Sequence, residues 1–98
     1  MILVRMIFQG KFGTGGKLAA SMVEMSRQMS EGLQAKGRVL SDLSGEFDTV
    51  VFESVHESLA AWEKYRAQMF AQEAEGSDTG EEYIVSGRQE YFTIEADF

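Results

Sequence analysis

The sequence predicts one α+β domain whose elements follow the order β-α-β-β-α-β. Short apolar runs with strand composition alternate with two longer stretches in which apolar residues recur at helical spacing. Glycines and polar residues lie between these segments, as turns require. The chain has 98 residues, of which 44% are hydrophobic and 26% charged. This size and composition are typical of a single globular domain, so we expect residues 1–98 to form one folding unit.

The first half of the chain predicts a strand followed by a helix. Residues 2–9 are rich in Ile, Leu, Val and Phe, and the glycine-rich residues 10–16 should end this strand. From Lys17 the period changes, which predicts a helix that ends after Lys36, where Gly37 follows. The apolar stripe of this helix has spacings of 4, 3, 4 and 4 and consists of Leu18, Met22, Met25, Met29 and Leu33.

The second half begins with a predicted hairpin and a second helix. Residues 38–44 and 47–55 have strand composition, and the turn signal at residues 44–46 joins them. The helix is predicted from His56 to about Gln72. One side of this helix carries Leu59, Trp62, Tyr65 or Arg66, Met69 and Phe70.

The end of the chain predicts the last strand of the sheet. A polar loop at residues 74–80 is followed by extended segments at 82–86 and 88–96, with Gly87 marking a bulge or a turn between them. The sequence leaves open whether residues 82–86 pair within their own chain or with a partner's. Interleaving the two β-α-β halves gives an antiparallel sheet in the strand order 4-1-3-2 with both helices on one face, which is a ferredoxin-like α+β fold.

The strands divide into two sets of side chains, because alternate residues of a strand face opposite sides of the sheet. The set expected under the helices is Val4, Met6, Phe8, Val50, Phe52, Phe92 and Ile94. The set expected on the other face is Leu3, Arg5, Ile7, Thr49, Val51, Glu53, Tyr91, Thr93 and Glu95. The second set is too apolar to lie in water, and the chain has no further element to cover it. We therefore expect a homodimer whose two sheets pack face to face.

Charge and missing residue types exclude several functions. Nine basic and sixteen acidic residues give a net charge of −7, which argues against nucleic acid and anionic membranes as partners. The chain has no cysteine, and its one histidine, His56, cannot form a two-histidine site, so we expect no metal and no cofactor. The apolar start is interrupted by Arg5 and is too short to span a membrane, and we expect a cytoplasmic protein.

The order of elements and two local motifs resemble a known superfamily. These are the loop that ends in Gly16-Lys17 before a helix, and the strand that leads through residues 55–59 (Val-His-Glu-Ser-Leu) into a helix carrying an aromatic residue. Together they resemble the dimeric α+β barrel superfamily, within it the small NIPSNAP-like and antibiotic-biosynthesis-monooxygenase-like domains. The resemblance covers nearly the whole chain and implies a dimer with a ligand pocket between each sheet and its helices.

The resemblance does not extend to haem degradation. Haem-degrading members of the superfamily use an Asn, a Trp and a His, whereas this chain has no Asn, and Gln72 stands ten residues after Trp62. Cofactor-independent monooxygenases of the group use polar and aromatic pocket residues. Only Trp62 and Tyr65 lie in the part of the second helix where such residues occur.

Two other features could carry chemistry, and each also has a structural interpretation. Arg5 and the carboxylates Glu53 and Glu95 could form a register-fixing ion network, which we favour, or a proton-transfer site. His56 is favoured as a residue at the start of a helix over a general base. The weak catalytic candidates are therefore His56, Tyr65, Arg5 and Glu53.

Two polar segments, the glycine loop at residues 10–16 and the acidic stretch at residues 73–82, are interpreted as connections between elements without a ligand site. The glycine loop lacks the Walker spacing, since Lys11 stands where that motif needs Gly, so a turn with a helix cap is favoured over an anion site. The acidic residues of the second loop lack the order of a calcium loop. They are Glu73, Glu75, Asp78, Glu81 and Glu82.

These observations favour a small homodimeric protein that binds an apolar or aromatic small molecule between sheet and helices. Methionines at helical spacing either line such a pocket or fill the core. The expected lining is Met6, Phe8, Met22, Met25, Phe52, Trp62, Tyr65 and Phe92. By family precedent the activity would resemble a cofactor-independent monooxygenase or isomerase. The alternative is a non-catalytic dimeric scaffold or regulatory module, which the lack of a sharp catalytic constellation favours.

Overall fold

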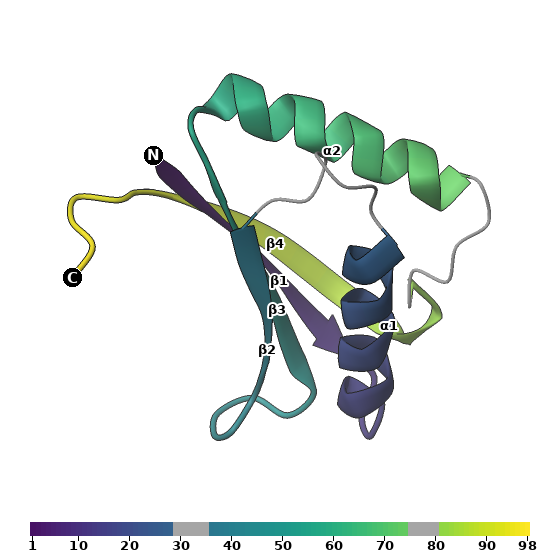
Figure 1. Cartoon of the computed structure of the whole chain (residues 1–98). Helices are drawn as coiled ribbons and strands as arrows, with labels where there is room; N and C mark the ends of the chain where they lie inside the picture. Colours follow the sequence, from purple (N-terminus) through teal and green to yellow (C-terminus); the bar gives the residue numbers. More distant parts are fainter. Residues whose placement is uncertain (29–35, 75–80) are drawn as a thin grey trace.

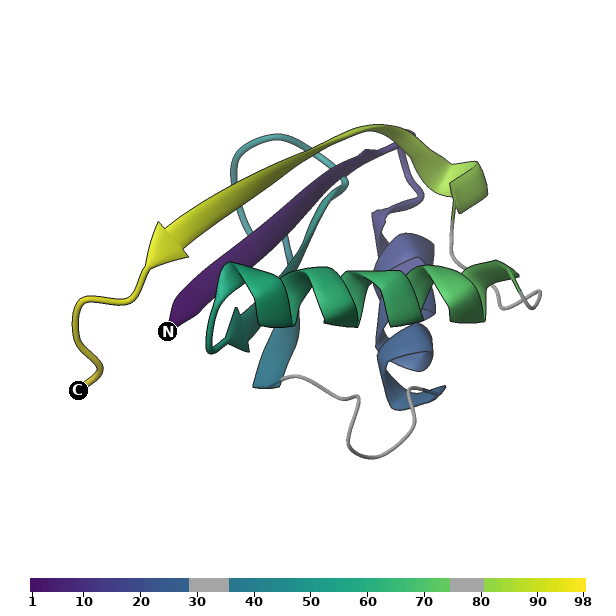
Figure 2. The same ribbon diagram turned by 90° about the horizontal axis from the view of Figure 1, so that it is seen from above.

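The computed structural model describes residues 1–28, 36–74 and 81–98, and these form a curved sheet with two helices on one side (Figures 1 and 2). The predicted order of elements is confirmed. The strands are β1 (Ile2–Gly10), β2 (Lys36–Ser41), β3 (Thr49–His56) and β4 (Ile84–Thr93). The helices are α1 (Gly15–Gln28), α2 (Leu59–Ala74) and a 3-10 turn at Glu81–Tyr83.

The sheet has the predicted strand order, with β2 next to β3, then β1 and β4, and every neighbouring pair antiparallel. The central strands β1 and β3 pair Val4 with Ser54 and Met6 with Phe52. Residues 84–86 pair with the end of β1 in the same chain, which answers the question of where that segment pairs. The fold is therefore the ferredoxin-like α+β fold expected from the sequence.

The core lies between the sheet and the two helices. Alternate side chains of β1 and β3 meet a stripe at helical spacing on each helix, as the amphipathic patterns predict. The buried cluster consists of Val4, Met6, Leu18, Met22, Met25, Val50, Phe52, Trp62, Tyr65 and Met69. Three residues of the predicted stripes lie outside the described side chains: Met29 and Leu33 of the first helix and Phe70 of the second.

The first helix is shorter than predicted at its C-terminal end, because Lys36 and Gly37 belong to β2. Gly37 lies opposite Ser54, and a Cβ at this glycine would collide with the carbonyl oxygen of Glu53. The glycine therefore allows two backbones to approach closely, whereas the prediction took it as a helix stop. Of the predicted polar loop at 74–80, Ala74 is the last residue of α2 (Leu59–Ala74), and residues 75–80 lie outside the described residues.

The last strand is one continuous element, which corrects the prediction of two segments separated at Gly87. The irregularity falls between Gln9 and Gly10, which pair with Ser86 and Ile84, so the extra residue is Val85. Gly87 pairs with Phe8, and a Cβ there would lie 3.1 Å from Cδ1 of the Phe8 ring. The glycine therefore makes room for an aromatic ring that lies across the strand.

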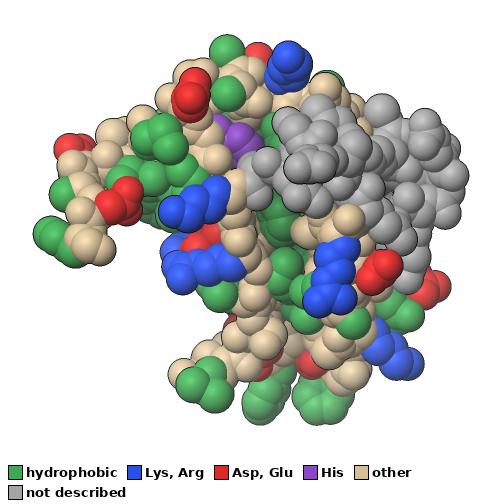
Figure 3. Space-filling view, in the orientation of Figure 1, with side chains coloured by type: hydrophobic (Ala, Val, Ile, Leu, Met, Phe, Trp, Pro, Cys, Tyr) green, Lys and Arg blue, Asp and Glu red, His purple; other side chains and the backbone are tan. Residues whose placement is uncertain are grey.

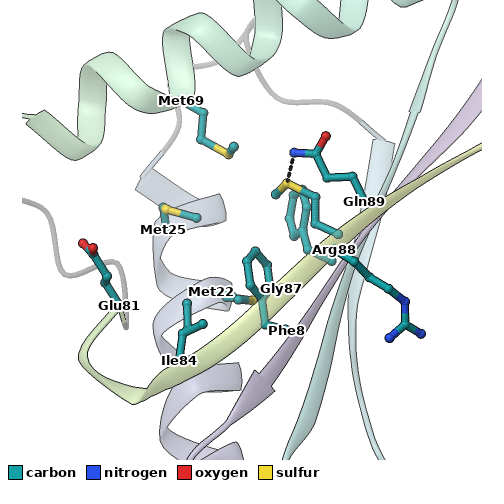
Figure 4. A pocket seen from close by; sticks show the side chains of 11 residues that line it. Phe8, Met22, Met25, Met69, Glu81, Ile84, Gly87, Arg88 and Gln89 are labelled. Carbon is teal, nitrogen blue, oxygen red and sulfur yellow. Dashed lines mark hydrogen bonds between the residues drawn. The ribbon is translucent and has the colours of Figure 1, made fainter.

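The facing of β4 was predicted the wrong way round. Tyr91 pairs with Val4 on the helix side, whereas Phe92 pairs with Leu3 on the open face and stacks with the guanidinium of Arg5 at 5.5 Å. The prediction assumed that the more apolar set of a strand faces the core. It failed because Gly87 and Gln89 occupy the helix side of β4 (Figure 4). Ile94 follows the end of this strand.

One acidic side chain holds the glycine loop in place. Asp48 has a φ of 60°, and its carboxylate accepts hydrogen bonds from the backbone N–H groups of Gly13 at 2.8 Å and Gly15 at 2.9 Å. Gly15 is the first residue of α1, so the carboxylate also satisfies a free donor at the helix N-terminus. An anion supplied by the chain itself therefore uses two of the donors that an anion-binding loop would offer.

We expect Asp48→Ala to lower the free energy of unfolding by about 1–2 kcal/mol, since it removes a helix cap and strains the left-handed backbone. Asp48→Asn should cost less, because Asn tolerates that backbone conformation and keeps one acceptor. Urea unfolding followed by circular dichroism measures both. Equal stability of the Ala variant and the parent would show that the clamp is dispensable.

Candidate functional site

A cavity of about 380 Å³ lies between the two helices and the β1–β4 side of the sheet (Figure 4). Its volume is in the range of small-molecule sites, roughly 300 to 1,000 Å³. Its wall is mainly thioether and aromatic, with few polar groups. The lining residues are Met6, Phe8, Met22, Met25, Phe52, Met69, Glu81, Ile84, Gly87, Arg88 and Gln89.

The sequence positions the methionines of the cavity by simple periodicity. Met22 and Met25 stand three residues apart, so they lie on the same face of α1. Met6 and Phe8 stand two apart on β1 and share the helix side of the sheet. Met69 comes from α2 and closes the wall opposite the sheet (Figure 4). Thioether side chains adapt to ligands of irregular shape, so this wall suits an apolar molecule.

Three lining residues carry polar side chains. Gln89 points into the cavity, where its Nε2 lies 3.9 Å from the Sδ of Met6. Its Oε1 accepts a hydrogen bond from the hydroxyl of Tyr91 at 2.7 Å. Figure 4 shows the side chain of Arg88 directed away from the methionines, and Glu81 on the side opposite Gln89. The cavity therefore has one amide and one carboxylate on an otherwise apolar wall.

Five of the eight predicted lining residues line the cavity: Met6, Phe8, Met22, Met25 and Phe52. Phe92 lies on the opposite face of the sheet, and Trp62 and Tyr65 pack beside the cavity in the core. The prediction missed Met69 as lining, although it placed this residue on the inner side of the second helix. It also missed Gln89, because the face on which this residue lies depends on the pairing of β4 with β1.

His56 lies in an aromatic cluster that is separate from the cavity lining. Its Nε2 is 2.8 Å from the hydroxyl of Ser54, and its ring lies 5.2 Å from that of Trp62 and 5.1 Å from that of Tyr65. Burial lowers the pKa of His56 below the usual 6.5 and raises the pKa of the Tyr65 phenol above 10.0. Both side chains are therefore neutral at neutral pH.

The lowered pKa of His56 predicts a loss of stability at mildly acidic pH. The unfolded chain takes up a proton near pH 6.5, before the folded chain does. Stability is therefore fully present above about pH 6.5 and falls as the pH drops through that value toward the folded pKa. We expect a lower urea midpoint at about pH 5.5 than at pH 7.5. The same comparison in His56→Gln should show a smaller difference, and an unchanged difference would assign the effect to other groups.

The open face of the sheet carries an ion network around Glu53, whose side chain is only 3% exposed. Arg5 donates to Oε1 of Glu53 at 2.8 Å, and Arg38 donates to Oε2 at 2.7 Å. Burial alone would raise the pKa of Glu53, but the hydrogen bonds and charges of both arginines hold the pKa below 4.5. The carboxylate is therefore ionised at neutral pH, and it is a structural anion and a poor proton acceptor.

The predicted partner of this network was Glu95, but Glu90 takes that place. Nη1 of Arg5 lies 3.9 Å from Oε1 of Glu90, and Nε of Arg88 lies 3.7 Å from Oε2 of Glu90. The register explains the change, because Glu90 pairs with Arg5 across β1 and β4, whereas Glu95 follows the end of β4. The predicted interpretation of Arg5 and Glu53 as an ion pair is confirmed.

A groove of about 730 Å³ runs along the open face and the loop between β2 and β3. Its apolar residues are Ile7, Leu40, Leu43 and Val51. At the end of the molecule where the loops lie, apolar side chains are exposed to solvent (Figure 3). Phe12 and Phe47 are 87% and 69% exposed there, and their rings meet edge to face at 6.0 Å. The open face and this loop end are the two candidate contact surfaces.

Several solved protein structures have a fold similar to that of this chain. An uncharacterised NIPSNAP domain protein from Burkholderia xenovorans matches with a TM-score of 0.72 at 15% identity, over 98% of this chain and 96% of the other. A NIPSNAP family protein from Agrobacterium tumefaciens matches with a TM-score of 0.67 at 14% identity, over 94% and 90%. A variant of MhuD, solved with two manganese protoporphyrin IX bound per active site, matches with a TM-score of 0.79 at 14% identity, over 100% and 98%.

The chain therefore has the α+β fold shared by NIPSNAP domain proteins and MhuD. The resemblance predicted from the sequence is confirmed at the level of fold. No protein-family model and no curated protein matches the sequence. Neither of the helices, as far as their residues are described, is long and apolar enough to cross a membrane. Within the described ranges no three His, Cys, Asp or Glu side chains come together as metal ligands.

Proposed function

We propose that this chain binds an apolar or aromatic small molecule in the cavity between its sheet and helices. The observation that carries the proposal is the composition of the wall: four thioethers and two phenyl rings border about 380 Å³ of space. The exposed lining residues Glu81, Arg88 and Gln89 show that this space opens to solvent. An open cavity of this size with an adaptable apolar wall is typical of a ligand site.

The geometry supports binding better than catalysis. The four catalytic candidates, His56, Tyr65, Arg5 and Glu53, all lie away from the described wall of the cavity. His56 and Tyr65 are neutral core residues, and the two charged residues belong to the open face. A monooxygenase-like or isomerase-like reaction would need a group that touches the ligand. Of the described residues, only Glu81 and Gln89 could act on a ligand in the cavity.

The residues of the cavity do not favour a porphyrin. Haem iron in proteins is held by His, by a Cys thiolate, by Tyr, or by Met together with His. The described wall of the cavity offers four methionines but no His, Cys or Tyr, and His56 is turned toward Trp62 and Tyr65. The proposal therefore includes no step through haem.

The test uses the methionines themselves as reporters. With ¹³C-methyl-methionine labelling, an apolar naphthalene such as 1-ethylnaphthalene should shift the methyl signals of Met6, Met22, Met25 and Met69 in a saturable titration. Met1, which is 62% exposed, serves as the internal control and should stay in place. Methionine methyl signals that do not shift with any of a panel of flat aromatic probes would contradict the proposal.

We propose further that two copies of the chain associate through the open sheet face. The groove there exposes Leu40 and Val51 beside the Arg5–Glu53 network, and Phe92 is 46% exposed on the same face. Native mass spectrometry should therefore show twice 10.9 kDa. Val51→Asp, which places a charge in the contact, should give monomer, and Arg5→Ala should weaken the dimer. A parent chain that stays monomeric at micromolar concentration would contradict the assignment of this face.

The second candidate function is a non-catalytic scaffold, and the exposed aromatic pair favours it. Phe12 and Phe47 project from two neighbouring loops with Leu43 nearby in sequence, as contact residues for another protein would. The methyl titration separates the two functions. A scaffold would leave the cavity signals unmoved by aromatic probes, whereas a binding protein would bind them with or without the substitution Phe12→Ser.

A further inference from the structure

We propose that the amide of Gln89 selects the ligand of the cavity by donating a hydrogen bond to it. The inference rests on the proposed binding function and names the class of ligand: an uncharged apolar molecule that carries a hydrogen-bond acceptor such as a carbonyl oxygen. Gln89 is the residue that determines this specificity, and Tyr91 is the residue that positions it.

The orientation of the amide is the first step of the argument. The hydroxyl of Tyr91 donates to Oε1 of Gln89 at 2.7 Å. A donor on the oxygen side turns the NH₂ group of the amide the other way, toward the cavity (Figure 4). Tyr91 and Gln89 stand two residues apart on β4 and share a face, so the strand itself sets this geometry.

The partner of the NH₂ group is the second step. The Nε2 of Gln89 lies 3.9 Å from the Sδ of Met6. A thioether sulfur is a weak acceptor, and an amide NH₂ group has two hydrogens to donate. Gln89 is exposed, so water solvates its NH₂ group when no ligand is bound. A ligand in the cavity displaces this water, and a carbonyl oxygen or a ring nitrogen then keeps the donor paired, whereas an alkyl group leaves it with the sulfur alone. The group is thus prepared for an acceptor on a ligand.

The charge of the site is the third step. Two lining residues are ionisable, Glu81 and Arg88. The guanidinium of Arg88 points away from the methionines, whereas Glu81 lies at the wall opposite Gln89 (Figure 4). The whole chain carries a net charge of −7. Among the described lining residues the carboxylate of Glu81 therefore borders the cavity while the one guanidinium points away from it, an arrangement that disfavours an anionic ligand relative to an uncharged one.

Three probes of one shape test the inference: 1-acetonaphthone, 1-ethylnaphthalene and 1-naphthoate. The first two differ by a carbonyl group in place of a methylene group, and in the third a carboxylate oxygen with its negative charge replaces the methyl group of acetonaphthone. Their affinities are measured by methionine-methyl titration in the parent, Gln89→Leu and Tyr91→Phe. The readout is the affinity ratio of acetonaphthone to ethylnaphthalene, because general damage to the cavity lowers both affinities and leaves their ratio unchanged.

In Gln89→Leu this ratio should fall roughly three- to tenfold, as expected for the loss of one hydrogen bond. Tyr91→Phe keeps the ring but frees the amide, so its ratio should fall by less. Glu90→Gln is the matched control, since it places an amide at the neighbouring position on the opposite face and should keep the parent ratio. Naphthoate should bind more weakly than acetonaphthone in every variant.

The outcomes separate this inference from the function on which it rests. An equal ratio in the parent and in Gln89→Leu, with both naphthalenes bound, overturns the role of Gln89 and leaves the binding function intact. Naphthoate that binds as tightly as acetonaphthone overturns the preference for an uncharged ligand. Methionine signals that no probe shifts overturn the binding function, and the inference with it.

Discussion

A chain carrying both Arg5→Met and Arg38→Met is expected to unfold with a free energy about 3 kcal/mol lower than that of the parent at neutral pH. Each arginine now donates to one oxygen of Glu53, whose side chain is 3% exposed. Methionine keeps much of the covering volume of arginine and removes its charge. The carboxylate would then stay covered without a partner, which is the costly arrangement for a buried charge.

The corresponding alanine pair separates burial from charge. The arginines themselves cover Glu53, and their own side chains are 36% and 69% exposed. Alanine at both positions would uncover the carboxylate, so water could solvate it and the loss should be smaller than with methionine. Adding Glu53→Gln to the methionine pair should recover most of the stability, because it removes the charge that lacks a partner. No recovery in the triple variant would contradict a charge-based origin.

The pH dependence of the stability tests the same idea, because the folded-state pKa of Glu53 is shifted in opposite directions in the parent and in the methionine pair. In the parent the pKa of Glu53 is held below 4.5, so its contribution is present above that pH and is lost as the pH falls through the folded pKa. In the methionine pair the arginines no longer counter the effect of burial, so the folded pKa lies above that of the unfolded chain. The difference in stability between the two proteins should therefore shrink as the pH falls from 7 to about 4, as urea unfolding at each pH measures.

Most of the fold could be predicted because its elements have clean periodicity. The stripe Leu18, Met22 and Met25 marks α1, and the alternation of Val4 and Met6 marks a strand with one buried face. Strand order followed from the handedness of the two β-α-β units. These are local patterns plus one topological rule, and they do not depend on knowing which residues pair.

The errors came from residues whose role depends on pairing. Gly37 resembles a helix stop in sequence, but its lack of a side chain serves the close approach of β2 to β3. The facing of Phe92 depends on the register of β4 against β1, which no local pattern contains. A glycine and a glutamine face the helices on β4, so the apolar side of that strand was taken for the buried side.

The candidate site was predicted only in part for the same reason. The methionines of α1 and β1 follow from periodicity, whereas the polar end of the cavity is built by β4. Gln89 could be placed there only once Met6 was known to be its partner across the strands. Trp62 and Tyr65 were expected to line the pocket, but their rings contact His56 and each other in the core.

Trp62→Ala is expected to lower the free energy of unfolding by about 3–5 kcal/mol, as large aromatic truncations in cores do. Trp62 is 2% exposed and is the largest of the fully buried side chains among the described residues. Its loss would leave a void beside His56 and Tyr65. A domain of this size has a total stability of about 5–15 kcal/mol, so the variant would keep only part of the parent's free energy of unfolding.

Two neighbouring substitutions make this prediction specific. Trp62→Phe should cost less, because the phenyl ring keeps the edge-to-face contact with His56 and leaves a smaller void. Glu63→Ala changes an exposed residue of the same turn and should stay within about 0.5 kcal/mol of the parent. Urea unfolding followed by far-ultraviolet circular dichroism measures all three, since the tryptophan signal is lost in two of them. A Trp62→Ala variant within 1 kcal/mol of the parent would contradict the docking of α2 through this face.

The same variant shows whether α2 leaves the sheet by itself or together with the rest of the domain. The side chains that dock α2 in the described core are Trp62, Tyr65 and Met69, one helical face in which Trp62 supplies the largest area. Methyl signals in Trp62→Ala distinguish the two outcomes. Global unfolding moves the signals of Met22, Met25 and Met69 together to their unfolded positions. Local undocking moves Met69 alone and removes one wall of the cavity, so aromatic probes would lose affinity while α1 and the sheet stay folded.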